Sequence, residues 1–251
     1  SASKVASFVV LGKLLLVGLG PLHGSAAWHS LVAGWMPVLA AVAALSIVLG
    51  NFLALSQKNV RRLLAYSAVA HTGYTLLGLL AGGVAGFSAT LFYTTIYAAT
   101  LLGTFGVIAL VRRQTGGDDF PHFAGLRTRS PLLAGCMAVF LLSLAGLPPL
   151  AGFFGKFYLF NVALRADANH GLLWLVALAL FGSLISLYYY LLVLKTIFLD
   201  EPAAVAQAGS TDRVAQVTIA TLAAVALLCG ILPGTLLTPI AHAVQSMLGT
   251  P

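Results

Sequence analysis

Seven long apolar segments constrain the fold of this chain more than any other feature of its sequence. They cover about residues 3–20, 32–55, 63–82, 86–111, 130–163, 171–199 and 214–236. A helix of about 20 apolar residues crosses the hydrocarbon core of a bilayer, because each residue adds about 1.5 Å. The apolar runs are continuous rather than alternating, which argues against a membrane β-barrel. The sequence therefore predicts an all-α, polytopic transmembrane bundle of about seven helices.

The composition excludes two other classes of protein. Charged residues make up 8% of the chain and hydrophobic residues 60%, whereas about a quarter of a soluble protein is charged. A soluble enzyme and a disordered protein are therefore excluded. The net charge is +7, but the basic residues lie at the ends of apolar runs and form no stripe with aromatic residues. We therefore expect a lipid bilayer around the chain and no nucleic-acid partner.

The basic residues also predict how the chain is oriented. Nine of them lie in the loops after the second, fourth and sixth segments: Lys58, Arg61, Arg62, Arg112, Arg113, Arg127, Arg129, Lys195 and Arg213. The other loops and the C-terminus carry only Arg165. Because basic loops stay on the cytoplasmic side, the pattern predicts a multi-pass protein of the cell inner membrane. Its N-terminal end would be cytoplasmic and its C-terminus outside.

Two of the seven segments do not have the length of a simple crossing. Residues 130–161 as one helix would extend about 48 Å, beyond a hydrocarbon core of about 30 Å. The sequence GLPPLAG predicts a break in the middle of the membrane at 146–152, because its two prolines remove backbone donors. In transporters such breaks often mark the transport site. The first segment is short, since only 16 residues separate Lys4 from Pro21. We expect that upstream residues are missing.

Four lysines lie within apolar segments, although all six acidic residues lie in loops. A charge inside the membrane costs several kcal/mol unless it is paired or hydrated. Lys13 and Lys195 are close enough to segment ends to reach an interface. Lys156, which follows the predicted break, has two interpretations. It either caps carbonyls that the break leaves free or carries protons, since a buried lysine can exchange between charged and neutral forms near neutral pH. Lys4 needs the same account if it lies in mid-helix.

Few other polar groups could relay protons between these lysines. His71 lies on the third segment, and Tyr93 and Tyr97 lie on the fourth, four residues apart on one face. Hydrogen bonding between helices is the alternative role for all three side chains. The tyrosines at 188–190 are expected to pack or to lie in an interfacial belt. Cys136 and Cys229 lie in apolar runs without further ligands, which predicts no metal site.

Three stretches of the sequence resemble one known family. They are GNFLALSQKNVRRLLAYSAVAHTGY at 50–74, LLSLAGLPPLAGFFGKFYLF at 141–160 and SLYYYL at 186–191, with SASKVASF at 1–8 as a weaker fourth match. They are similar to the antiporter-like proton-channel subunits of respiratory complex I, the NADH:quinone oxidoreductase. The QKNVRR loop and the lysine at 156 favour the branch called subunit N over the branches called L and M.

The resemblance implies a single transmembrane domain over 1–251. It would correspond to helices eight to fourteen of a family built from two inverted repeats, with the N-terminal half absent. It also implies that Lys156 is the broken-helix lysine of the second half-channel and Lys4 the linking lysine. Tyr93 would lie near the family's polar axis.

As part of such a translocase, the chain would couple electron transfer from NADH to quinone to proton transport. The protons would follow a hydrated row from Lys4 through water, His71 and hydroxyls of the fourth segment to Lys156. Other membrane subunits of complex I would be its partners. NADH, FMN, iron–sulfur clusters and quinone would be bound elsewhere in the complex and not by this chain, which carries no flavin, cluster or nucleotide motif.

Two alternative functions stay open from the sequence. The chain could belong to a multi-subunit sodium/proton antiporter, which predicts a dependence on cations without NADH. It could also be a structural membrane-arm subunit, in which the lysines hold neighbouring helices through carboxylates of other chains. In that case we expect loss of a lysine to block assembly rather than pumping.

Overall fold

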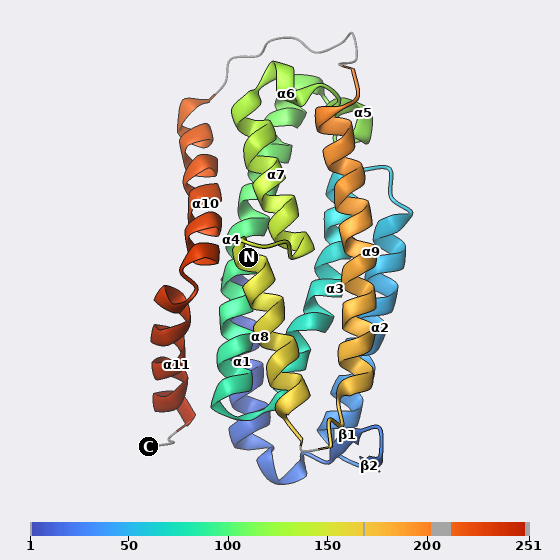
Figure 1. The fold of residues 1–251 in the computed structure, drawn as a ribbon, viewed down its shortest axis with the longest axis vertical. Coiled ribbons are helices and arrows are strands. Elements are labelled where there is room, and N and C mark those ends of the chain that lie inside the picture. The colour runs from blue at the N-terminus through green and yellow to red at the C-terminus, as the bar shows by residue number, and fades with distance from the viewer. Residues whose placement is uncertain (1, 168, 202–211, 249–251) are drawn as a thin grey trace.

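The computed structural model describes residues 2–167, 169–201 and 212–248 as a bundle of roughly parallel helices (Figure 1). Five helices are long and apolar enough to cross a membrane: α2 (Trp35–Leu55), α3 (Val60–Ala81), α4 (Gly83–Thr115), α9 (Leu173–Phe198) and α10 (Arg213–Ile231). Each lies within a few residues of a predicted segment. The predicted membrane bundle is therefore confirmed, and the chain is an integral membrane protein.

The fifth predicted segment forms two short helices, as expected. Helix α7 (Pro131–Ala145) ends at the middle of the bundle, and α8 (Ala151–Arg165) continues below it in Figure 1. Gly146 ends α7 in the left-handed conformation, with φ of 89°, a conformation that glycine adopts at little cost. Neither 15-residue helix is long enough to cross alone, so the pair together makes one crossing.

The first segment is helical over α1 (Ala2–Lys13), a π-helical turn η1 (Leu14–Gly18) and a 3-10 turn η2 (Gly20–Leu22). Because the 12 residues of α1 extend only about 18 Å, the helix occupies the lower half of the bundle in Figure 1. It packs against α4, and Gly12 faces the ring of Phe87. Ser1 and Pro251, whose sides of the membrane the charges predict, lie outside the described residues.

The basic loops gather at one end of the bundle, the top of Figure 1, with the short helices α5 (Phe120–Phe123) and α6 (Leu126–Arg129). Asp118 is largely buried there and forms ion pairs with Arg61 (3.2 Å) and Arg112 (3.5 Å). The Asn59 side chain accepts from Arg62 N at the start of α3 and donates to Asp119 Oδ1 at 2.9 Å. These contacts tie the α2–α3 loop to the α4–α5 loop.

The opposite end holds two elements that the sequence did not predict. An antiparallel hairpin of β1 (Ser25–Ala27) and β2 (Ser30–Val32) lies under the bundle, so the structure is not entirely α-helical. Trp174 Nε1 donates to Ala26 O at 3.1 Å and holds the hairpin against α9. The seventh segment ends at Ile231 instead of residue 236, because the residue before a proline is disfavoured in a helix and Pro233 follows. A further helix, α11 (Gly234–Leu248), then runs along this end.

The core consists of two large apolar clusters and a small third cluster around Phe92. One large cluster surrounds Leu64, Val107 and Phe140, and the other surrounds Leu77 and Leu159. Tyrosines belong to both large clusters, and buried polar residues of α3, α4, α8 and α9 lie among them, including Ser67, His71, Thr94, Thr100, Lys156 and Ser186.

Candidate functional site

Lys156 lies on the second turn of α8, directly after the break, and is only 5% exposed. Its Nζ donates to Ala145 O, the last carbonyl of α7, at 2.9 Å and to Ser183 Oγ of α9 at 2.8 Å. The C-terminal carbonyls of a helix carry partial negative charge, which favours an ammonium group beside them. No carboxylate among the described residues forms an ion pair with this lysine. The lysine therefore does cap a carbonyl at the break. Its charged form is stabilised by two neutral acceptors, Ala145 O and Ser183 Oγ.

Residues at the break hold the end of α7 and the start of α8 together. Gly152 N donates to Ser143 Oγ at 3.1 Å, which joins the start of α8 to the last turn of α7. A Cβ placed on Gly152 would lie 1.9 Å from Ser143 O. The backbones of α7 and α8 thus approach each other more closely than any side chain at position 152 allows.

His71 is buried on α3, and both of its ring nitrogens contact tyrosine hydroxyls. Its Nδ1 lies 2.6 Å from Tyr93 OH on α4, and its Nε2 lies 3.1 Å from Tyr190 OH on α9. Tyr190 OH also contacts Ser67 Oγ. Because a hydroxyl can donate or accept, either tautomer of His71 is satisfied. The arrangement lets a proton leave one nitrogen while the other takes one up.

Lys4 reaches the same group of residues from α1. Its Nζ donates to Ala68 O at 3.0 Å and lies 4.6 Å from the centre of the Tyr97 ring. The Tyr97 ring stacks on His71 with 4.7 Å between ring centres. A lysine ammonium over an aromatic face is attracted by the ring. Tyr97 therefore contacts both Lys4 and His71.

Tyr74 makes the corresponding contacts toward the second lysine. Its ring centre lies 5.5 Å from that of His71 and 5.3 Å from Lys156 Nζ. The contacts thus run from Lys4 through Tyr97, His71 and Tyr74 to Lys156. We call these five residues the polar row.

A small cavity of about 10 Å³ adjoins the polar row at the break, bordered by His71, Tyr93, Ile96, Tyr97, Thr100, Ser143, Leu144 and Gly152. A volume of this size holds about one water molecule. Tyr97 OH is buried and makes no hydrogen bond to the described residues. A water in the cavity would lie beside Tyr97 and beside Ser143 and Gly152, which flank the break.

The structure thus brings together all five residues that the sequence singled out: Lys4, His71, Tyr93, Tyr97 and Lys156. Other polar side chains of α4 form their hydrogen bonds elsewhere. The hydroxyls of Thr100 and Thr104 donate to carbonyls of their own helix, at 2.8 and 2.7 Å, a habit of threonine in helices. Lys13 and Lys195 are exposed, as expected for lysines near helix ends.

Tyr190 and Tyr74 are the site residues that sequence reasoning missed. Tyr190 was expected to pack or to lie at an interface, and Tyr74 appeared only as the last residue of the stretch at 50–74. Of the three tyrosines at 188–190, Tyr188 is 58% exposed while the other two are fully buried. Helical spacing predicts that the three point in different directions, but it does not say which of them meets His71.

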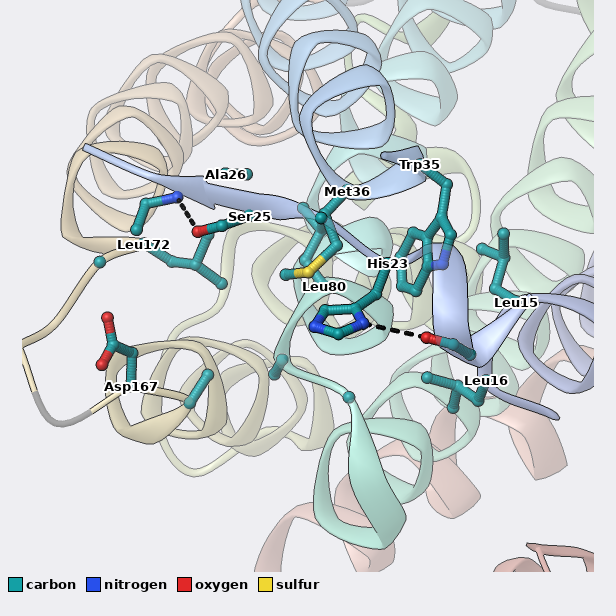
Figure 2. Close-up of a pocket in the computed structure, with 17 residues that line it drawn as sticks. Leu15, Leu16, His23, Ser25, Ala26, Trp35, Met36, Leu80, Asp167 and Leu172 are labelled. Carbon is teal, nitrogen blue, oxygen red and sulfur yellow. Dashed lines mark hydrogen bonds between the residues drawn. The ribbon is translucent and has the colours of Figure 1, made fainter. Parts of the chain in front are cut away.

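No cluster of three or more His, Cys, Asp or Glu side chains suited to a metal ion is present in residues 2–167, 169–201 and 212–248. A separate cavity of about 460 Å³ opens at the hairpin end of the bundle (Figure 2). Leu15, Leu80 and Leu172 line it together with His23, whose Nδ1 contacts Gly20 O at 2.9 Å. These three leucines belong to the apolar cluster around Leu77 and Leu159. None of the hydrogen bonds in the described parts of the chain links the cavity to His71.

These features define a class of protein: a polytopic membrane bundle with a helix broken in mid-membrane and with a buried and a half-buried lysine that form no ion pair with the described carboxylates. The family described as NADH:quinone oxidoreductase/Mrp antiporter, TM, matches residues 7–186. The chain belongs to this family.

Individual relatives agree with this assignment. NADH-quinone oxidoreductase subunit N 2 of Acidobacterium capsulatum is 49% identical over 237 residues, which cover 94% of this chain and 48% of the relative. A chain of respiratory complex I from Thermus thermophilus with bound aureothin is 36% identical, with a TM-score of 0.68, over 80% of this chain and 45% of that one. The chain thus spans about half the length of the relatives it matches.

A third match concerns the fold alone. A chain of the Mrp complex from Dietzia sp. has a TM-score of 0.76 but only 23% identity, over 85% of this chain and 47% of that chain. The fold of the bundle is therefore shared between complexes whose names differ.

Proposed function

We propose that this chain translocates protons as part of a membrane subunit of an NADH:quinone oxidoreductase, corresponding to helices eight to fourteen of the antiporter-like family. The observation that carries the proposal is the polar row, which joins the half-buried Lys4 to the buried Lys156 beside a broken helix. The 49% identity to a subunit N from Acidobacterium capsulatum supports the choice of complex.

In this mechanism Lys4 takes up a proton and passes it by way of water in the cavity beside Tyr97 to His71. His71 transfers it toward Lys156 while its other nitrogen exchanges with a tyrosine hydroxyl, Tyr93 or Tyr190. Because a positive charge on His71 or Lys4 disfavours a charge on Lys156, protonation of one group promotes release from the next. The partial charges at the end of α7 hold Lys156 ready to accept the proton.

The energy for this movement would come from electron transfer elsewhere in the complex. NADH, FMN, iron–sulfur clusters and quinone would be held by other subunits, with which this chain would assemble in the membrane. The basic end of the bundle would face the cytoplasm and the hairpin end the outside, in the inner membrane. The nine basic residues at one end support this orientation.

Replacing Lys4 by methionine tests the proposal at the entrance of the row. We expect Lys4→Met in the full-length subunit to lower NADH-driven proton pumping by about threefold to tenfold, equivalent to roughly 0.7–1.4 kcal/mol. The loss is partial because Lys4 is only half-buried and water can replace part of its function. Pumping would be measured in membranes and divided by the amount of assembled complex.

Lys13→Met is the matched control, because Lys13 is an exposed lysine at the other end of the same helix. It should pump like the unmodified complex. Equal loss in both variants would contradict the proposed role of Lys4. Proton movement that follows sodium instead of NADH would favour an antiporter complex.

A further inference from the structure

The ring of Tyr74 lies between the two groups that would exchange a proton. It contacts the His71 ring edge-on at 5.5 Å between centres and the Lys156 ammonium at 5.3 Å from its own centre. Proton transfer requires a hydrogen bond between donor and acceptor or a water that bridges them. While the aromatic ring keeps this orientation, it excludes such a water, so transfer requires the ring to move. The orientation of Tyr74 therefore decides whether His71 and Lys156 can communicate.

Asn51 of α2 determines that orientation. Its side chain is fully buried, and its Nδ2 donates to Tyr74 OH at 2.9 Å and to Ile47 O at 2.8 Å. Its Oδ1 accepts from Tyr189 OH at 3.2 Å. Its amide thus has partners on both sides, and one of them is the hydroxyl of the ring that separates the proton carriers.

The backbone around this hydrogen bond leaves little room for movement. A Cβ on Gly50 would lie 2.4 Å from a backbone nitrogen of α3, and one on Gly73 would lie 2.7 Å from a backbone oxygen of α2. Helices α2 and α3 therefore touch on both sides of the Asn51–Tyr74 bond, as their neighbouring positions in Figure 1 show. The register of the two helices is fixed where Asn51 meets Tyr74.

Helix α9 also packs directly against the hydrogen bond between Asn51 and Tyr74. A Cβ on Gly182 would lie 2.7 Å from Asn51 Nδ2 and 2.9 Å from Tyr74 OH. The next residue, Ser183, accepts the hydrogen bond of Lys156. Two consecutive residues of α9 thus lie beside Tyr74 and hold Lys156.

We propose that Asn51 is a positioning residue that keeps the Tyr74 ring between His71 and Lys156 and so controls proton transfer between them. This inference rests on the proposed function. Asn51 carries no proton itself. When its hydrogen bond is lost, the ring moves more freely, protons return along the row, and fewer protons are translocated for each NADH oxidised.

The test compares three variants of the full-length subunit in the assembled complex. Asn51→Leu keeps the branched shape of the side chain and removes every hydrogen bond of the amide, and Tyr74→Phe removes only the hydroxyl that Asn51 holds. Tyr189→Phe is the control, because it removes the other side-chain partner of Asn51 and leaves the bond to Tyr74. The measurement is the number of protons translocated per NADH oxidised, over a range of pH.

We expect Asn51→Leu and Tyr74→Phe each to lower this ratio by about twofold to tenfold, the range that one hydrogen bond commands. The double variant should fall no further than either single one, because both changes break the same bond. Tyr189→Phe should keep the ratio of the unmodified complex. The pH profile of the ratio should change with the first two variants only.

A purely structural role predicts another pattern, in which all three variants lose complex but keep the ratio in what assembles. That pattern, additive losses in the double variant, or an equal fall with Tyr189→Phe would each overturn the inference. If Asn51→Leu does not assemble, Tyr74→Phe decides, since it deletes a single oxygen. Lys156→Met in the same membranes separates the two proposals. Normal pumping there overturns the proposed function, whereas lost pumping there with a normal ratio in Tyr74→Phe overturns only the role of Asn51.

Discussion

Lys156→Met is expected to reduce NADH-driven proton pumping by about 100-fold or more, the lower end of what one proton-transferring side chain contributes. Methionine has nearly the length of lysine and fills its place, but it cannot bind or release a proton. The methionine side chain keeps the packing contacts of residue 156 on α8, whereas Ala145 O and Ser183 Oγ each lose the donor of a hydrogen bond. An unsatisfied buried group costs about 1–3 kcal/mol, so we expect the complex to assemble.

The measurement is proton uptake driven by NADH, with the assembled complex quantified in the same membranes. Lys195→Met is the control, because it removes the same charge from an exposed lysine at the end of α9. Normal pumping in Lys156→Met would show that Lys156 is not a required proton carrier and that its role is to cap the carbonyl at the break. Absence of the complex would favour the structural alternative.

The parts of this site that could be predicted from the sequence depend on local chemistry. Two consecutive prolines with glycines on both sides interrupt a helix through local sterics and lost backbone donors, so GLPPLAG predicted the end of α7 and the start of α8 to within a few residues. Lys4 and Lys156 stood out because a charge in an apolar run is exceptional. Tyr93 and Tyr97 could be placed on one face by helical spacing alone.

The partners of these residues could not be predicted, because they come from distant parts of the chain. Tyr190 lies 119 residues after His71 and Asn51 lies 138 residues before Tyr189. A single tyrosine or asparagine in an apolar helix does not indicate which helix it faces. The hairpin at 25–32 was missed for the same reason, since it depends on contacts with α9 and with Gly171.

Gly152→Ala is expected to remove most of the assembled complex from the membrane. The added Cβ would lie 1.9 Å from Ser143 O and 2.7 Å from Ser143 C. Both are backbone atoms, so no side chain can turn away to make room. The helices α7 and α8 would have to separate, which would also break the bond from Gly152 N to Ser143 Oγ. Overpacking of this kind costs about 3 kcal/mol, which we expect to appear as less complex and a lower unfolding temperature.

Gly135→Ala is the matched control, because it adds the same methyl group to the same broken crossing. A Cβ on Gly135 meets nothing within 4 Å, and alanine favours a helix over glycine by about 0.8–1.0 kcal/mol. This variant should therefore assemble at least as well as the unmodified chain. Normal assembly of Gly152→Ala would contradict the tight contact at the break. If only Gly152→Ala reduces the amount of assembled complex, the close contact of α7 and α8 at the break is essential, whereas a glycine elsewhere in the same crossing is not. This contact positions Lys156 and the cavity beside it.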